Sequence, residues 1–282
     1  MKASYELIKH NDKQSFLART FDAEGFNAPY HYHREYELTY IVSGTGKRYV
    51  GSHMENFGPG DLVLLGPNVP HCWKLEDKQD DACSIVIQFV PEFLGDDFFT
   101  RHELRHISRL LQKSGNGICF KSVNADMKVI MQQFTGNSES FKKLLLLLDA
   151  LQTLAKSRNQ VLLDQHGILP GISMSEQPRI NPVFAYLVEN FRCHVSLEEA
   201  AGIANMTPNA FCKYFKRVTR RTFMDTIIEY RLSYATQLLV QTDKPISAIA
   251  FDCGFGDVSH FYKTFKARMQ VSPLNYRKKF LE

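Results

Sequence analysis

The stretch that decides the fold of the C-terminal part is Ile246–Pro273, which reads ISAIAFDCGFGDVSHFYKTFKARMQVSP. Apolar residues such as Ile246 and Ile249 recur there at the spacing of one helical face, and Gly254 ends this run. Asp257 is a residue type favoured at helix N-caps, and the segment after it again carries apolar residues at helical spacing. The pattern predicts two helices joined by a short glycine-containing turn.

The second of these helices has two different faces. Phe261 and Phe265 belong to the predicted buried face. The opposite face carries Ser259, His260, Tyr262, Lys263 and Lys266. These side chains donate hydrogen bonds or carry positive charge, and base edges in the major groove of DNA present acceptors to such groups. The stretch is therefore typical of a helix-turn-helix that reads DNA.

A similar pattern occurs about fifty residues earlier. Ser196 and Glu199 form a capping-box pattern, and Thr207 followed by Pro208 predicts the start of the next helix. The two patterns align Leu197 with Ile246, Ala201 with Ala250, Phe211 with Phe261 and Phe215 with Phe265, with one residue more in the second turn. The intervening segment Thr222–Thr242 predicts a helix that sets two recognition helices about 34 Å apart, one turn of duplex.

The second pattern resembles the DNA-binding half of AraC/XylS-type transcription regulators. The matching residues are Ile249, Ala250, Gly254, Phe255, His260, Phe261, Phe265, Lys266 and Pro273, followed by a tail that ends at Arg277. The resemblance implies an all-α double helix-turn-helix domain with double-stranded DNA as its partner. It implies base contacts by Asn209, Ala210, Cys212 and Lys213 in the first half, and by Val258, Ser259, His260 and Lys263 in the second.

Two kinds of contact are expected from these helices. Lys216, Arg217 and Lys266 are expected to neutralise phosphates, which gives affinity without sequence choice. Asn209 suits adenine, and Lys213 and Lys263 suit guanine. Ala210 and Cys212 are equally compatible with a spacer role.

The N-terminal part carries three histidines and one carboxylate in a spaced pattern. His31, His33 and Glu37 alternate along a predicted extended segment, so they share one side of it, and His71 follows a Pro-rich turn. Residues 25–71 resemble the two cupin motifs of a small jelly-roll β-barrel. The matching positions in metal-binding cupins are His31, His33, Glu37 and His71, which suits a first-row divalent metal.

The alternative is a pocket without metal. These four residues and Trp73 would then line the site of an effector, on whose ring Trp73 would stack. Between 96 and 158 the apolar spacing turns helical, most clearly over Phe141–Lys156. That helix either packs on the barrel or pairs with the same helix of a second subunit, which leaves a homodimer open.

Length and charge agree with more than one domain. The 282 residues contain 34 Lys and Arg against 30 Asp and Glu, and 15 of the basic but only 9 of the acidic residues lie between 179 and 282. We predict an α+β multidomain protein. Its parts are a cupin-like effector-sensing barrel over 1–95, a helical extension with possible dimerisation helices over 96–158, a linker over 159–179 and an AraC-type DNA-binding domain over 180–282.

Several classes are disfavoured. The six cysteines form no CxxC pair, the N-terminus shows no secretory signal, and the apolar run 144–148 is too short to span a bilayer. We therefore expect a cytoplasmic protein with reduced thiols and no membrane partner.

The function predicted from these parts is a ligand-responsive, sequence-specific transcription regulator rather than an enzyme. The resemblance implies genes of carbohydrate or related metabolism, a small-molecule effector such as a sugar, and RNA polymerase as a further partner. The alternative is a metal-dependent cupin enzyme, a dioxygenase or isomerase. The effector, the operator, the direction of regulation and the oligomeric state are left open.

Overall fold

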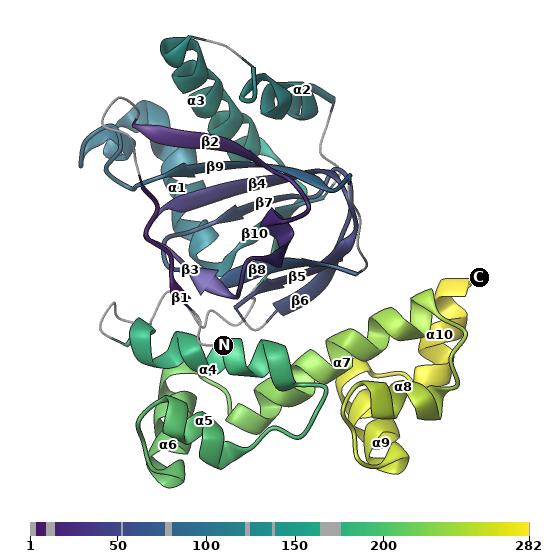
Figure 1. Cartoon of the computed structure of the whole chain (residues 1–282). Helices are drawn as coiled ribbons and strands as arrows, with labels where there is room; N and C mark the ends of the chain where they lie inside the picture. Colours follow the sequence, from purple (N-terminus) through teal and green to yellow (C-terminus); the bar gives the residue numbers. More distant parts are fainter. Residues whose placement is uncertain are drawn as a thin grey trace. The chain divides into compact units, whose positions relative to one another are not determined.

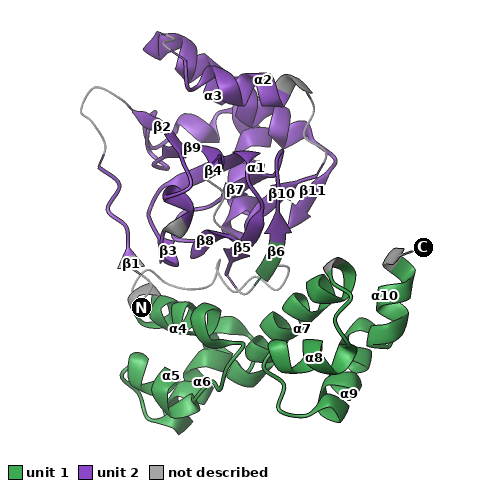
Figure 2. Ribbon diagram, turned by 45° about the vertical axis from the view of Figure 1, so that its right-hand side comes forward, with its two compact units in different colours: residues 1–3, 52–55, 174–282 green, residues 4–51, 56–173 purple. Residues whose placement is uncertain are grey.

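The computed structural model describes residues 4–9, 15–51, 53–76, 81–121, 125–136, 139–163 and 176–281. Two compact units make up the chain (Figure 2). One contains residues 4–51 and 56–173 and is called here the barrel unit. The other contains residues 174–282 with two short N-terminal pieces, 1–3 and 52–55, and is called the helical unit.

Two sheets form the barrel. The five-stranded sheet has the order β1 (Ser4–Tyr5), β3 (His31–Tyr32), β8 (His71–Leu75), β5 (Gly46–Val50) and β6 (His53–Phe57). The six-stranded sheet has the order β11 (Gln160–Leu162), β10 (Ile118–Phe120), β7 (Leu62–Leu65), β4 (Tyr36–Ser43), β9 (Cys83–Phe89) and β2 (Phe16–Phe21) (Figure 1). The predicted fold class, a cupin-like barrel followed by an all-α double helix-turn-helix domain, is confirmed.

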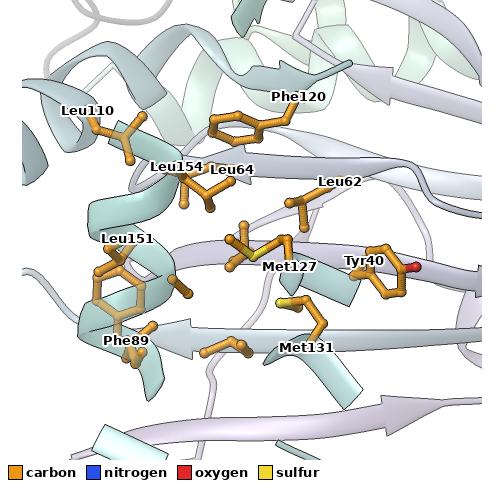
Figure 3. Close-up of a cluster of buried hydrophobic side chains, with 14 of the residues drawn as sticks. Tyr40, Leu62, Leu64, Phe89, Leu110, Phe120, Met127, Met131, Leu151 and Leu154 are labelled. Carbon is orange, nitrogen blue, oxygen red and sulfur yellow. The ribbon is translucent and has the colours of Figure 1, made fainter. Parts of the chain in front are cut away.

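Strand alternation divides the core of this unit into two layers. Along β7, Leu62 and Leu64 pack in one apolar cluster, whereas Val63 and Leu65 pack in another. Successive side chains of a strand point to opposite faces, so a strand that is apolar throughout must be covered on both sides. One cover is the inside of the barrel, and the other is a layer of helices (Figure 3).

The helical layer comes from the segment after the barrel strands. Its helices are α1 (Arg105–Lys113), α2 (Ala125–Gln133) and α3 (Ser140–Lys156). The barrel unit also contains short 3-10 turns at Gly25–Asn27, Phe98–Thr100, His102–Leu104 and Ser114–Asn116. Leu147, Leu151 and Leu154 of α3 are buried against the six-stranded sheet. The strongest apolar helix predicted from the sequence therefore packs within its own chain. Among the described residues, every helix is too short or too polar to reach across a lipid bilayer.

Two predictions for this unit were incomplete. β10 lies inside the segment expected to be helical, and β11 lies inside the expected linker, because both strands extend the six-stranded sheet beyond β7. The remainder of the expected linker up to residue 175 lies outside the described residues. The turn at Gly44 connects β4 of one sheet to β5 of the other.

The helical unit contains seven helices within residues 176–281. They are α4 (Gln177–Asn190), α5 (Leu197–Ile203), α6 (Pro208–Thr219), α7 (Phe223–Gln241), α8 (Ile246–Asp252), α9 (Val258–Met269) and α10 (Pro273–Leu281). Ser196, Thr207 and Asp257 cap α5, α6 and α9 as predicted, each accepting a hydrogen bond from a backbone N–H three residues on. α4 begins at Gln177, inside the expected linker 159–179, and contains Pro182.

The two helix-turn-helix halves repeat in detail. Asn205 and Gly254 have positive φ angles of 55° and 83°, and each turn closes with a backbone bond back to the first helix, Met206 N to Ala201 O and Phe255 N to Ala250 O. In the first half the cap Thr207 follows directly. In the second half Gly256 intervenes before the cap, so it is the additional residue that the sequence alignment required.

Candidate functional site: a histidine-rich barrel cavity and a paired helical surface

Three strands bring the predicted histidines and the glutamate together inside the barrel. His31 of β3 pairs directly with His71 of β8, and their ring centres lie 4.4 Å apart. His33 follows β3, with its ring centre 5.2 Å from that of His71. One ligand atom from each of the three histidines lies within 4.8 Å of the other two. The alternation seen in the sequence therefore produces a real cluster.

Backbone carbonyls orient two of the rings. Nδ1 of His31 donates to Pro29 O at 2.8 Å, and Nδ1 of His71 donates to Val69 O at 2.7 Å. A carbonyl only accepts, so each Nδ1 carries a proton and a neutral ring keeps its lone pair on Nε2. Nε2 of His71 lies 3.5 Å from Glu37 Oε1, too poorly placed for a hydrogen bond.

Glu37 is the centre of the polar network. His33 Nε2 lies 3.0 Å from Oε2, the Thr39 hydroxyl donates to Oε1 at 2.7 Å, and the Gln88 amide donates to Oε2 at 2.9 Å. Burial alone would raise the pKa of Glu37. The electrostatic effect of the neighbouring His71 and the hydrogen bond from His33 outweigh it and hold that pKa well below its usual range. Glu37 is therefore a carboxylate at neutral pH.

The protonation of the histidines differs. His33 lies between two buried carboxylates, since Nδ1 is 3.4 Å from Glu35 Oε2. Burial opposes its charge, but the bonds to Glu35 and Glu37 prevail and raise the pKa of His33 to about 10. Burial, together with the charge of His71, lowers the pKa of His31 to about 3. The metal-free cluster thus holds a cationic His33 beside a neutral His31.

A cavity adjoins this cluster. It has an empty volume of about 550 Å³, part of which is open to solvent, and its wall includes His31, Glu37 and Trp73. Its apolar wall is formed by Phe21, Phe26, Ile41 and Val86, and its polar wall by Glu6, Thr39, Ser84 and Gln88. Trp73 is 8% exposed, and its indole Nε1 is buried without a hydrogen-bond acceptor in the described part of the chain. A donor in that state favours a ligand that supplies an acceptor.

Three of the four predicted metal ligands, His31, His33 and His71, lie close enough together to hold a divalent cation, with Glu37 bound to His33 beside them. Metal-binding imidazoles usually donate their second N–H to a carbonyl or carboxylate, and here Pro29, Val69 and Glu35 stand at the three Nδ1 atoms. Glu37 adds the carboxylate, and Nε2 of the buried His71 has no hydrogen-bond partner among the described residues. Three imidazoles and one carboxylate are a donor set for a first-row metal.

The helical unit presents the predicted DNA-contacting residues on α6 and α9. Figures 1 and 2 both show these helices at the same edge of the unit, joined through α7. The side chains exposed there are Asn209, Ala210, Cys212, Lys213, Lys216, Arg217, Ser259, His260, Lys263 and Lys266. Val258 differs, because it is half-buried against the core of the second half.

One of these cations already has an acidic partner. Arg217 Nη2 lies 2.5 Å from Glu176 Oε1, just before α4. Both side chains are at least partly exposed, so this pair contributes little to stability and its partner is exchangeable. The sequence offered no signal for this contact, nor for Glu35 and Gln88 beside the predicted cluster, because all three depend on tertiary placement.

Comparisons with known proteins agree with this arrangement. Residues 200–279 match a family model described as a helix-turn-helix domain, and residues 19–87 match one described as a cupin domain. The chain is 25% identical over 258 residues to the HTH-type transcriptional activator RhaS of Enterobacter sp. (strain 638), covering 88% of this chain and 87% of that one. The chain thus carries a helix-turn-helix domain of the AraC type and a cupin domain, in the order predicted from the sequence.

Two further relatives are also named as regulators. It is 21% identical over 258 residues to the uncharacterized HTH-type transcriptional regulator YdeC of Bacillus subtilis, covering 89% of this chain and 86% of that one. It is 30% identical over 107 residues to the Melibiose operon regulatory protein of Escherichia coli (strain K12), covering 38% and 35%. The helix-turn-helix match and these relatives confirm the prediction of a DNA-binding regulator.

Proposed function

We propose that this chain is a ligand-responsive transcription regulator that binds a small effector in the barrel cavity and two adjacent DNA boxes through α6 and α9. The observation that carries the effector proposal is that Trp73, a residue of the cavity wall, has a buried indole Nε1 with no hydrogen-bond acceptor among the described residues. Thr39, Ser84 and Gln88 provide further polar groups beside it. A pocket with an apolar wall and a few polar groups is the usual form of a small-molecule site.

The effector class that fits is a small polyhydroxylated metabolite, such as a sugar. Hydroxyl groups accept from the indole N–H and exchange hydrogen bonds with the amide and hydroxyls of the polar wall. One relative is named for a melibiose operon. Such a ligand switches the protein only if it binds the DNA-competent and DNA-incompetent states with different affinity.

A divalent metal held by His31, His33, Glu37 and His71 is part of this proposal. A bound ion would supply positive charge and open coordination positions for oxygen donors of the effector. Glu35 and the carbonyls of Pro29 and Val69 would keep the imidazoles oriented toward it. Metal analysis of the purified protein before and after treatment with a chelator tests this part. Absence of stoichiometric Fe, Mn, Zn, Co, Ni or Cu after growth and purification with each metal would contradict it.

The rival function, a metal-dependent cupin enzyme, shares the same four residues. The regulators named above favour the non-enzymatic role, and the predicted DNA-binding domain, 180–282, occupies over a third of the chain. Turnover of a candidate effector by the metal-loaded protein would favour the enzyme. Tight binding of the effector without its conversion would favour the sensor.

Other partners follow from the regulator role. RNA polymerase and a second copy of the chain are proposed partners in the cytoplasm, where the operator lies. α3 still exposes Phe141 and Leu145 while its opposite face is buried, so a homodimer through this helix is compatible with its packing in the barrel unit. Sedimentation of wild type and a Phe141→Ser, Leu145→Ser variant tests it, and an unchanged dimer in the variant would exclude α3.

Ligand binding and its coupling to DNA are testable together. A panel of sugars and related polyols would be screened by the shift they cause in thermal unfolding, and hits would be added to DNA-binding titrations. Trp73→Phe keeps the ring but removes the donor, so we expect weaker effector binding with unchanged basal DNA affinity. Equal effector affinity in wild type and Trp73→Phe would reject the role of the indole N–H.

A further inference from the structure

The C-terminus of α4 contacts the turn of the second helix-turn-helix directly. Residues Phe191–Cys193 follow α4, and residues Asp252–Phe255 connect α8 to α9. Arg192 Nε donates to Asp252 O at 3.2 Å, and a Cβ placed on Gly254 would lie 2.8 Å from the carbonyl oxygens of Phe191 and Arg192. The two halves therefore meet at a close backbone contact in addition to their covalent link through α7. We call these two segments, with Arg231, the seam.

Arg231 lies at the centre of the seam. Its Nε donates to Phe191 O at 2.7 Å and its Nη2 donates to Cys193 O at 2.8 Å. These carbonyls follow the last turn of α4, where the helix dipole favours a cation. The same guanidinium lies 5.8 Å from the centre of the Phe255 ring. One side chain of α7 thus contacts the end of the first half and the turn of the second.

The position of Arg231 along α7 separates two cores. Tyr230 stacks on Phe191 with ring centres 5.8 Å apart, which places it in the first half. Leu232 and Leu239 belong to the apolar cluster of the second half. α7 therefore links the two cores only through its own packing with each, and the seam adds a direct link between them.

The seam also leads to the second recognition helix. The Phe255 ring contacts the rings of Phe261 and His260, with centres 5.1 and 5.7 Å apart. Phe261 is buried, whereas His260 is exposed on the face proposed to meet DNA. A shift of the seam would therefore move the residues at the start of α9.

We propose that Arg231 is a positioning residue that fixes the rotation and separation of α6 relative to α9, and thereby the spacing between the two DNA boxes that the protein accepts. This inference rests on the proposed paired use of α6 and α9. One base pair added between two boxes rotates one box by about a tenth of a turn relative to the other, because B-DNA repeats every 10–10.5 base pairs. A rigid pair of helices rejects such a change, and a loosened pair tolerates it.

The test uses full-length protein and DNA selected by wild type from a random pool. Affinity is measured for the selected site and for sites with one base pair inserted or removed between the boxes. For Arg231→Ala we expect weaker binding to the selected site. We define the spacing ratio as the Kd for an altered site divided by the Kd for the selected site. We also expect this ratio to fall by at least about threefold, the low end of measured coupling between contacting residues. A merely destabilised domain would lower the active fraction and leave this ratio unchanged.

Two further variants keep the test decisive. Arg277→Ala is the matched control, since Arg277 also bonds two carbonyls, Leu239 O at 3.1 Å and Lys244 O at 2.7 Å, but within the second half. We expect its spacing ratio to equal that of wild type. Arg192→Ala removes an exposed seam residue, so it reports on the seam even where Arg231→Ala fails to fold.

The possible results distinguish the positioning role of Arg231 from the paired use of α6 and α9 on which it rests. A relaxed spacing ratio in the seam variants, with the control unchanged, supports the inference. A wild-type ratio in folded Arg231→Ala, or in Arg192→Ala where Arg231→Ala does not fold, overturns it. Selection of DNA with one box instead of two overturns the proposed paired grip itself.

Discussion

Lys263 on α9 is the residue at which sequence choice is easiest to test. Its side chain is exposed on the face of the recognition helix, and a lysine suits the acceptors of guanine. We expect Lys263→Ala to weaken specific binding by about 1–3 kcal/mol and to relax preference at one base pair. Anisotropy titrations on the selected site and its single-base variants measure both effects.

The matched control for Lys263 is Lys156→Ala. It removes the same exposed charge from α3, in the barrel unit. We expect unchanged base preference in this control. Equal affinity of wild type and Lys263→Ala for the selected site would remove Lys263 from the contact set.

His33 makes the stability of the metal-free barrel depend on pH. Against burial, its bonds to Glu35 and Glu37 raise its pKa to about 10, so the folded state holds the proton more tightly than the unfolded state, where the pKa is near 6.5. This stabilisation is complete below about pH 6.5 and is lost as the pH rises toward 10. Thermal unfolding of chelator-treated protein should therefore show a midpoint that falls over this range.

His33→Gln is the control for that titration. We expect a lower midpoint at pH 6 and a flatter decline toward pH 10, since Gln does not titrate. An equally steep decline in the variant would assign the pH dependence to another group.

At the scale of elements, the turn between α8 and α9 depends on a glycine. Gly254 has a φ of 83°, and a Cβ there would come within 2.8 Å of backbone atoms of Phe191 and Arg192. The left-handed conformation alone costs an L-residue roughly 1–2 kcal/mol, and the close contact adds to it. We expect Gly254→Ala to destabilise the helical unit by at least about 2 kcal/mol.

Gly256, two residues on, is the control for that change. A Cβ on Gly256 meets no atom within 4 Å, and its φ lies outside the positive range. Denaturant unfolding should place Gly256→Ala near wild type and Gly254→Ala well below it. Similar stability for both variants would show that the turn rearranges freely.

The elements that could be predicted from the sequence are those specified by local chemistry. The caps Ser196, Thr207 and Asp257 start their helices where predicted, because each bond spans three residues. The strands β10 and β11 were missed, since three-residue strands carry no readable alternation and form only by pairing with β7 and with each other.

In the candidate sites, too, the residues predicted from the sequence are those specified by local patterns, and the others depend on tertiary contacts. His31, His33 and Glu37 were found because alternation along the chain is local, and His71 because of its motif. Arg231 shows the opposite case, since its role comes from carbonyls 38 and 40 residues away in sequence. Trp73 was predicted as a stacking surface, but the structure adds a buried donor to that description.

At the scale of the whole molecule, the proposed regulator couples a sensing cavity to a DNA-binding pair. Effector addition should change the affinity of wild type for the selected DNA, because the proposed effector binds the DNA-competent and DNA-incompetent states with different affinity. We expect Glu37→Gln to abolish this response while leaving effector-free DNA binding intact, since it removes the charge at the centre of the polar network. Circular dichroism and unmodified DNA affinity serve as folding controls, and a wild-type effector response in this variant would contradict the sensing role of the cluster.

Whether α6 and α9 bind one face of duplex DNA as a pair can be measured by a base-pair substitution scan of the selected site. Wild type, Lys213→Ala of α6 and Lys263→Ala of α9 would be compared at every position. We expect two sensitive boxes about one helical turn apart, roughly 10 base pairs, with each variant losing discrimination in a different box. Loss of discrimination in the same box by both variants, or a single box throughout, would contradict it.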